Sequence, residues 1–139
     1  MLAAGPAVAR RAQEKIEAER NTDSRLLSLA NGNPSAITAE MVARAWREGD
    51  AASKATLEET ADLLAIWLGN MIDILEPDVI VIGGGMSELV ASWFDRIRTQ
   101  IPQWSVNSLC DEIRFVRAQY GEDSGIAGAA ALCVSVGAP

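Results

Sequence analysis

The first half of the chain carries apolar residues at helical spacing. In each of four stretches, the apolar side chains recur every three or four residues and fall on one face of a helix. The last stretch is the longest, and its second apolar face, which includes Trp67 and Met71, indicates burial on two sides. The predicted helices span residues 6–20, 25–30, 38–48 and 50–76.

Breaker and capping residues separate these helices. The sequence NGNP at residues 31–34 predicts a break between the second helix and the third. Thr38 is placed to cap the amino end of the third helix, and Gly49 is placed to close it in a left-handed conformation. Asp50 then caps the fourth helix, which we expect to stop at Pro77.

The pattern changes in the second half of the chain. Residues 79–82 read VIVI, a run of β-branched residues that is typical of a strand buried on both faces of a parallel sheet. The sequence then predicts a helix over residues 87–101, a second strand over 113–117, and a buried helix of small residues over 124–135. A right-handed crossover would make the two strands parallel neighbours. Two strands are too few for an independent sheet, so the chain looks incomplete.

Three consecutive glycines, Gly83, Gly84 and Gly85, follow the first strand. Glycines at the carboxyl end of a strand let backbone N–H groups approach a ligand, and the next helix adds partial positive charge, so one interpretation is a nucleotide contact. The other interpretation is a tight turn that needs positive φ angles. A dinucleotide fingerprint is disfavoured because its third glycine falls on Glu88.

A second glycine-rich segment occupies residues 121–131. Gly125 and Gly128, together with the alanines, predict a helix that either packs closely against a neighbour or frames a nucleotide cleft beside the triple glycine. Glu122 and Asp123 are the acidic pair nearest to this region, and we take them as further candidate site residues.

Composition excludes several kinds of chemistry. The 139 residues fit one ordinary domain, and 49% of them are hydrophobic, which is too many for a disordered chain. The chain has no histidine, so it has neither a histidine general base nor a Ser-His-Asp triad. With 12 basic and 19 acidic residues, the net charge of −7 argues against nucleic acid as a partner. The sequence assigns no catalytic residue and no metal ligand.

Nothing in the sequence predicts secretion or a membrane span. The most apolar tract, residues 125–137, is too short to cross a bilayer, and no basic start precedes an apolar run as in a signal peptide. The two cysteines, Cys110 and Cys133, lie far apart without a CxxC motif, which favours thiols in a reducing compartment. We therefore expect a cytoplasmic protein.

Five landmarks, in order along the chain, resemble the C-terminal half of ROK-family proteins. Residues 76–87 read EPDVIVIGGGMS and follow a long helix, which resembles the family's D/EPxxIVIGGGxS pattern. Residues 121–132 are similar to its GxDAGxxGAAxL segment, and residues 38–50 to its TAxxVxxAxxxGD stretch. Residues 4–7 resemble the SGxA that follows the family's zinc motif. The family groups sugar kinases such as bacterial glucokinase with sugar-responsive repressors.

The resemblance implies an α/β fold of the actin and hexokinase type, in which ATP binds between two ribonuclease-H-like lobes. Residues 1–139 would form the C-terminal lobe, with a helical first half followed by β-α-β-α. The backbone at Gly83, Gly84 and Gly85 would contact the nucleotide, with Ser87 beside it. The family transfers the γ-phosphoryl group of ATP to a sugar hydroxyl, with Mg²⁺ and an aspartate base, and its members commonly form homo-oligomers.

Several parts of the family's machinery have no counterpart in this sequence. The DxGxT phosphate loop, the NDxN segment with the catalytic aspartate, the zinc motif and the sugar ligands are missing. We therefore expect the chain to be the C-terminal segment of a ROK protein, without an N-terminal lobe of about 150–180 residues. On this expectation, the chain alone is catalytically inactive.

Three functions are compatible with these patterns. The chain is the nucleotide-side part of a glucokinase-like hexose kinase, the effector and oligomerisation part of a ROK-type transcriptional repressor, or an assembly module that associates through its long helix. Kinases and repressors share this region, so the sequence does not separate the first two.

Overall fold

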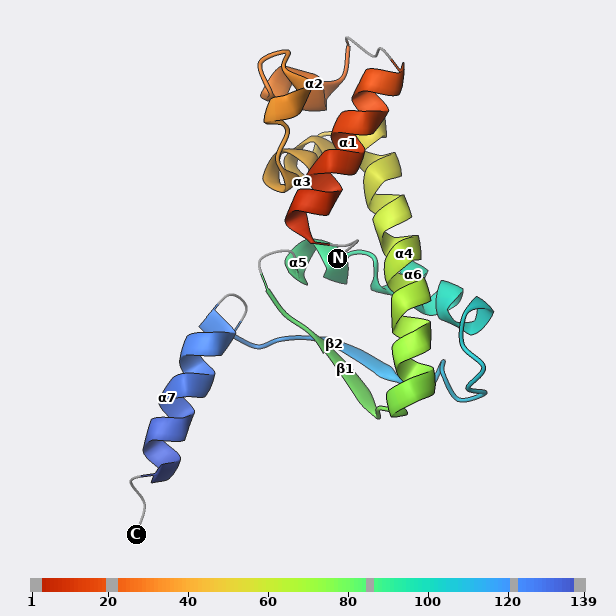
Figure 1. Ribbon diagram of the computed structural model, residues 1–139, viewed down its shortest axis with the longest axis vertical. Helices are drawn as coiled ribbons and strands as arrows, with labels where there is room; N and C mark the ends of the chain where they lie inside the picture. The colour runs from red at the N-terminus through yellow and green to blue at the C-terminus, as the bar shows by residue number, and fades with distance from the viewer. Residues whose placement is uncertain (1–3, 20–22, 85–86, 121–122, 137–139) are drawn as a thin grey trace.

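Helices make up the first half of the fold, and a parallel strand pair with flanking helices makes up the second (Figure 1). The computed structural model describes residues 4–19, 23–84, 87–120 and 123–136. The elements, which include two short 3-10 helices, are α1 (Gly5–Glu19), α2 (Arg25–Leu29), η1 (Pro34–Ala36), α3 (Ala39–Arg47), α4 (Ala51–Leu75), β1 (Val79–Ile82), α5 (Ser87–Ala91), α6 (Phe94–Gln100), η2 (Ile101–Gln103), β2 (Arg114–Arg117) and α7 (Ser124–Val136).

Helices α1, α3 and α4 pack around one hydrophobic cluster, as their apolar faces predicted. Val8, Val42 and Leu57 are buried in it, one from each helix. At the edge of the cluster, the buried Arg11 of α1 donates a 2.7 Å hydrogen bond from Nη2 to Oγ1 of Thr60 in α4. Burial lowers the pKa of the Arg11 guanidinium, and nearby Glu59 opposes that shift.

The predicted helix ends in this half are confirmed. Thr38 Oγ1 accepts a 3.3 Å hydrogen bond from the Met41 amide at the start of α3, and Gly49, just beyond its end, has a φ of 88°. Helix α4 then runs unbroken to Leu75, where Glu76 adopts a left-handed conformation with a φ of 44°. The following proline prevents the helix from continuing.

Asp50 serves two helices at once. Its Oδ1 accepts a 2.7 Å hydrogen bond from the Ser53 amide and so caps α4. Its Oδ2 accepts hydrogen bonds from Ser24 Oγ at 2.6 Å and from the Leu26 amide of α2 at 3.2 Å. Burial would raise the pKa of Asp50, but these hydrogen bonds outweigh it and hold the pKa below its ordinary value. One carboxylate therefore binds the amino ends of α2 and α4 together.

The loop after η2 lies tightly against α4. A Cβ on Gly69 would meet Trp104 Cβ at 3.1 Å and the Trp104 backbone at 3.2 Å, so glycine permits this close approach. One helical turn further on, Asp73 Oδ1 accepts hydrogen bonds from Ser105 Oγ at 2.5 Å and from the Val106 amide at 3.1 Å. The hydrogen bond from Ser105 is the main reason that the pKa of Asp73 lies below its ordinary value.

Strands β1 and β2 are parallel neighbours, as predicted, and Ile82 pairs with Arg117. The prediction that β1 is buried on both faces is wrong for the residues that the structure describes. Ile80 packs against the neighbouring cluster, whereas Val79 and Val81 are 37% and 59% exposed. The described part of the chain covers one face of the strand and leaves the other open.

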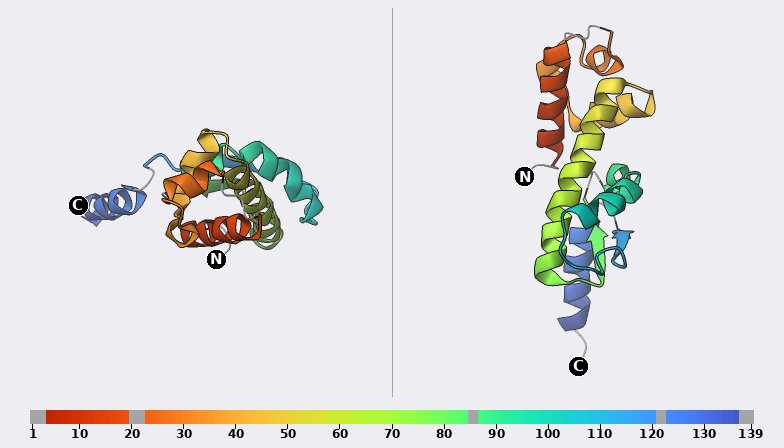
Figure 2. Two further views of the ribbon diagram at one scale, coloured as in Figure 1. Left: turned by 90° about the horizontal axis from the view of Figure 1, so that it is seen from above. Right: turned by 90° about the vertical axis from the view of Figure 1, so that its right-hand side faces the viewer.

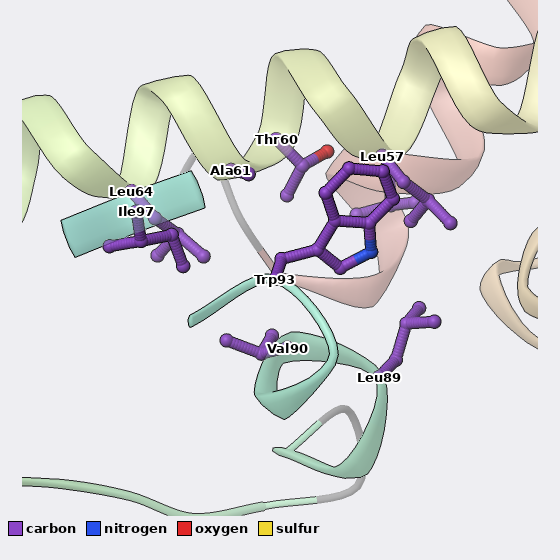
Figure 3. A pocket seen from close by; sticks show the side chains of 9 residues that line it. Leu57, Thr60, Ala61, Leu64, Leu89, Val90, Trp93 and Ile97 are labelled. Carbon is purple, nitrogen blue, oxygen red and sulfur yellow. The ribbon is translucent and has the colours of Figure 1, made fainter. Parts of the chain in front are cut away.

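The single helix predicted over residues 87–101 is interrupted. Helix α5 ends at Ala91, and α6 begins at Phe94. Between them, the amides of Ser92 and Trp93 hydrogen-bond three residues back, at 3.1 and 2.9 Å. This tightened turn directs Trp93 toward α4 (Figure 3). Helix α6 ends at Gln100, and Pro102 follows inside η2.

Trp93 joins the two hydrophobic clusters of the fold. The second cluster lies along the carboxyl half of α4 and includes Ile72, Ile97 and Ile113. Trp93 packs against both clusters, and its ring centroid lies 5.6 Å from that of Trp46. The indole therefore marks the joint between the helical half and the strand half.

Helix α7 leaves the body of the fold after β2 (Figures 1 and 2). Ile126 and Leu132 are 73% and 67% exposed, and a Cβ on Gly125 or Gly128 would meet no atom within 4 Å. The prediction that this helix is buried is therefore wrong for the described residues, because no described element covers these positions. Of the helices that the structure describes, none combines the length and the apolar character needed to cross a membrane.

Candidate functional site

Both strands end at the same edge of the sheet (Figure 1). Because β1 and β2 are parallel, the glycine segment after Ile82 and the turn after Arg117 emerge there together. The Ala118 amide donates a 2.8 Å hydrogen bond to the Ile82 carbonyl, which holds the two exits side by side. The two glycine-rich segments that the sequence singled out therefore start from one place.

The described glycines of the loop, Gly83 and Gly84, each have a structural reason to be glycine. A Cβ on Gly83 would lie 3.1 Å from Ala118 Cβ, and Gly84 has a φ of 94°, which L side chains rarely adopt. A close contact with a side chain thus accounts for Gly83, and a positive φ accounts for Gly84. A Cβ on Gly84 would nevertheless meet nothing within 4 Å, so the loop also leaves open space for a ligand. Gly85 lies outside the described residues.

Ser87 lies beneath the loop rather than on it. Its amide donates a 3.0 Å hydrogen bond to the Gly84 carbonyl, and the residue is only 6% exposed. The helix that it begins, α5, has five residues, so it contributes a weaker dipole than a long helix would. The hydrogen bond orders the loop, and a direct contact between Ser87 and a nucleotide stays a prediction.

The charged candidates at this edge are only partly described. Asp123 is exposed, and its amide donates a 3.0 Å hydrogen bond to the Tyr120 carbonyl just before α7, while Glu122 lies outside the described residues. Helix α7 starts near this edge and leads away from the strands (Figure 1). Sequence reasoning missed the exposed Arg117, because only the strand register places that cation opposite Ile82 and next to the glycine loop.

A small cavity lies between α4 and α5 (Figure 3). It has a volume of about 20 Å³, and Trp93 points across it toward Leu57 and Thr60 of α4. Ligand pockets are usually ten or more times larger, so this cavity is a packing gap and not a sugar or nucleotide site.

Two larger hollows flank the strands. One, of about 410 Å³, lies at their amino ends and is lined by Glu76, Asp78 and Glu112, whose negative charge repels phosphate. The other, of about 470 Å³, is the α4–β1 groove. It is lined by Leu64, Trp67, Leu68, Met71, Leu75, Pro77, Val79, Ile80, Val81, Ile82, Gly83, Ser87 and Val90. This lining contains no charged residue, and Gly83 and Ser87 connect the groove to the glycine loop.

The described residues also offer no preformed metal centre. Within the ranges that the structure describes, no three side chains of the types His, Cys, Asp and Glu lie together as ligands of a metal ion. Cys110, which the sequence predicted to be a free thiol, is buried and unpaired with another cysteine.

The model of the ROK family matches residues 1–136. The chain belongs to the ROK family. The predicted family is therefore confirmed over nearly the whole ROK chain.

Curated relatives of this ROK chain are kinases of an amino sugar. N-acetyl-D-glucosamine kinase from Escherichia fergusonii is 39% identical over 93 residues, which make up 65% of the chain and 29% of that kinase. The kinase of the same name from Citrobacter koseri is 39% identical over 90 residues, which make up 63% of the chain and 28% of that kinase. The ROK chain thus spans less than a third of the curated relatives that it matches.

Solved structures with the same fold confirm the predicted fold class. A ROK family glucokinase from Streptomyces griseus, in complex with glucose and AMPPNP, superposes with a TM-score of 0.80 and 28% identity. The match covers 94% of the ROK chain and 42% of the glucokinase. A structure from Cytophaga hutchinsonii gives a TM-score of 0.78 at 18% identity and supports the fold alone. The ROK chain is part of an α/β domain of the actin and hexokinase type.

Proposed function

We propose that this ROK chain is the nucleotide-side part of an ATP-dependent sugar kinase, which transfers the γ-phosphoryl group of ATP to a hexose. The observation that carries the proposal is the open glycine edge, where Gly83 and Gly84 follow a parallel strand and are both exposed. The glucokinase that superposes on the chain was solved with AMPPNP and glucose, which supports a nucleotide and a sugar as ligands.

The proposal assigns nucleotide contact to the backbone at Gly83, Gly84 and Gly85, while Ser87 orders the loop from below. The sugar is glucose or N-acetylglucosamine, the substrates named by the similar proteins. Mg²⁺, when bound with ATP, offsets the charge of the phosphates. Because the sequence lacks the family's DxGxT, NDxN and zinc motifs, the proposal assigns the metal ligands, the aspartate base and the zinc site to a part outside these 139 residues.

The chain alone should therefore be inactive. Purified chain incubated with ATP, Mg²⁺ and either glucose or N-acetylglucosamine is expected to give no ADP above the rate without sugar. Sugar-dependent ADP formation by the isolated chain would overturn this part of the proposal. The proposed enzyme is cytoplasmic, and it contacts neither nucleic acid nor membrane through this segment.

The glycine loop can be tested in a full-length ROK protein that carries this chain. Gly84→Val should lower the affinity for AMPPNP at least 100-fold and leave the affinity for the sugar unchanged, because the side chain fills the open space and strains the positive φ. Isothermal titration with each ligand measures both affinities.

Gly32→Val is the matched control for this variant. Gly32 also has a positive φ, 77°, and open space around it, but it lies between α2 and η1, away from the strand edge. The control should carry a similar backbone strain and keep its AMPPNP affinity. Equal losses in the two variants, or none in Gly84→Val, would contradict the assigned loop. Sugar binding without any phosphorylation by the full-length protein would instead favour the repressor function.

A further inference from the structure

We propose that Leu89 is a positioning residue for the glycine loop. Its side chain fixes the short helix α5 to the helical half of the fold, and α5 in turn holds the loop at Gly83 and Gly84. The use of this loop by a nucleotide rests on the proposed function, whereas the ordering of the loop by Leu89 can be measured without any nucleotide.

Helix α5 follows the loop directly and is too short to fix its own position. It has five residues, and isolated helices shorter than about 12 residues are marginal in water. Its first residue, Ser87, donates the 3.0 Å hydrogen bond from its amide to the Gly84 carbonyl. The conformation of the loop therefore depends on where α5 is held, and tertiary packing decides that position.

Leu89 supplies this packing. It is 5% exposed and belongs to the hydrophobic cluster that α1, α3 and α4 surround. Of the buried members of this cluster in the described ranges, Leu89 alone comes from beyond residue 57. The strand half is therefore fastened to this cluster through the helix that follows the glycine loop, with the partly buried Trp93 beside it.

The side chain of Leu89 lies at the cavity between α4 and α5. Figure 3 shows it pointing from α5 toward Trp93 and Leu57. Val8 of α1 lines the same cavity, so two helices of the helical half face Leu89 there. Close-packed neighbours fill the space of a lost side chain only in part. A shorter side chain at position 89 would therefore enlarge the cavity and allow α5 to move.

A leucine that served global stability alone would give a different result. Its truncation would lower the free energy of unfolding, as at any buried leucine, and would leave the folded loop unchanged. Leu26 provides this comparison. It is 0% exposed and belongs to the same cluster, but it lies on α2, away from the glycine loop (Figure 1).

Three variants of a full-length ROK protein that carries this chain test the proposal: Leu89→Ala, Leu89→Met and Leu26→Ala. Hydrogen exchange followed by mass spectrometry measures the protection of residues 87–93. This segment includes the amides of Ser87, Ser92 and Trp93, whose hydrogen bonds hold the loop and the end of α5. Isothermal titration measures the affinities for AMPPNP and for the sugar, and thermal unfolding compares the stabilities.

Leu89→Ala should speed exchange over residues 87–93 about tenfold and weaken AMPPNP binding about tenfold, with sugar affinity unchanged, because the loop opens locally while the fold persists. Leu89→Met conserves the side-chain volume and should keep both values near those of the wild type. Leu26→Ala should lower the unfolding temperature at least as much as Leu89→Ala does, yet leave this exchange and the AMPPNP affinity unchanged.

Two results would overturn the proposal: unchanged exchange over residues 87–93 in Leu89→Ala, or equal acceleration in Leu26→Ala. If Leu89→Ala does not fold, the milder Leu89→Val is judged by the same two results. Where the wild type binds AMPPNP, an equal affinity in the position 89 variant also makes the positioning role wrong. Faster exchange in that variant, together with a wild type that binds no AMPPNP, contradicts only the proposed function.

Discussion

At the residue scale, the carboxylate of Asp50 stabilises the amino ends of two helices, α2 and α4. It accepts hydrogen bonds from two helix amides and from the hydroxyl of Ser24. A capping aspartate at this position was predictable from the Gly49-Asp50 pair, because the local pattern marks a helix end and a helix start. The hydrogen bonds from Ser24 and Leu26 were not predictable, because these residues lie about 25 positions earlier and reach Asp50 only through the tertiary fold.

Asp50→Ala should lower the free energy of unfolding by about 2–3 kcal/mol. About 1 kcal/mol follows from the lost cap, and the rest follows from the buried partners that are left unsatisfied. Urea unfolding at pH 7, followed by circular dichroism, measures the change. Asp111→Ala, at an exposed position, is the control and should change the value by less than about 0.5 kcal/mol.

The difference in unfolding free energy between the wild type and Asp50→Ala depends on pH in a defined direction. The pKa of Asp50 is lower in the folded chain than its ordinary value, so the carboxylate stabilises the fold above the unfolded-state pKa of about 3.9. This contribution disappears as the pH falls through the lower, folded-state pKa. The difference between wild type and Asp50→Ala should therefore shrink below about pH 4, and a constant difference from pH 7 to pH 3 would contradict the assigned hydrogen bonds.

At the element scale, the sequence predicted most starts and ends correctly and failed where packing decides. The strand VIVI, the cap at Thr38 and the left-handed Gly49 are local signals, and all are found in the structure. The break at Ser92 and Trp93 carries no glycine or proline, so only the packing of the indole against α4 reveals it. The exposure of β1 and α7 was missed because burial depends on partners that a local pattern does not contain.

Substitution by alanine should have opposite effects on stability at two glycines inside helices. Gly69→Ala places a methyl group against the backbone of Trp104, which cannot rotate away, so the loop and its hydrogen bonds to Asp73 must shift. We expect a loss of about 1 kcal/mol in unfolding free energy, since overpacking outweighs the better helix propensity of alanine. Urea unfolding measures it.

Gly128→Ala is the matched substitution on α7. Open space surrounds Gly128, so the added methyl group costs nothing and the helix propensity improves by about 1 kcal/mol. Helical ellipticity at 222 nm should rise, while the unfolding midpoint of the remaining fold stays unchanged. A stabilising Gly69→Ala, or a destabilising Gly128→Ala, would contradict the packing described for these helices.

At the scale of the whole molecule, the described residues leave apolar surface uncovered, above all beside β1 and along α7. The α4–β1 groove exposes Trp67 and Val81, and α7 exposes Ile126 and Leu132. The triple-glycine edge was predictable as a candidate site because strand, glycines and helix follow one another in sequence. The contribution of Arg117 to this edge was not, since it depends on strand register.

The isolated chain should self-associate because of this uncovered surface. Light scattering over a concentration series from about 5 to 200 μM is expected to show an average mass that rises with concentration, as exposed apolar patches of this kind promote contact. The double variant Ile126→Lys and Leu132→Lys should reduce the rise, because it places charge on α7. A monomeric mass throughout the series would contradict the prediction.

The joint between the two hydrophobic clusters has a consequence for spectroscopy. Trp46 and Trp93 lie 5.6 Å apart, with ring planes inclined by 41°. Two indoles at this distance couple their electronic transitions, and the coupling depends on their mutual angle. Any movement of the strand half against the helical half, including one caused by nucleotide at the glycine edge, would alter the near-ultraviolet circular dichroism. The near-ultraviolet circular dichroism of the Trp46–Trp93 pair therefore reports on the relative position of the two halves of the protein.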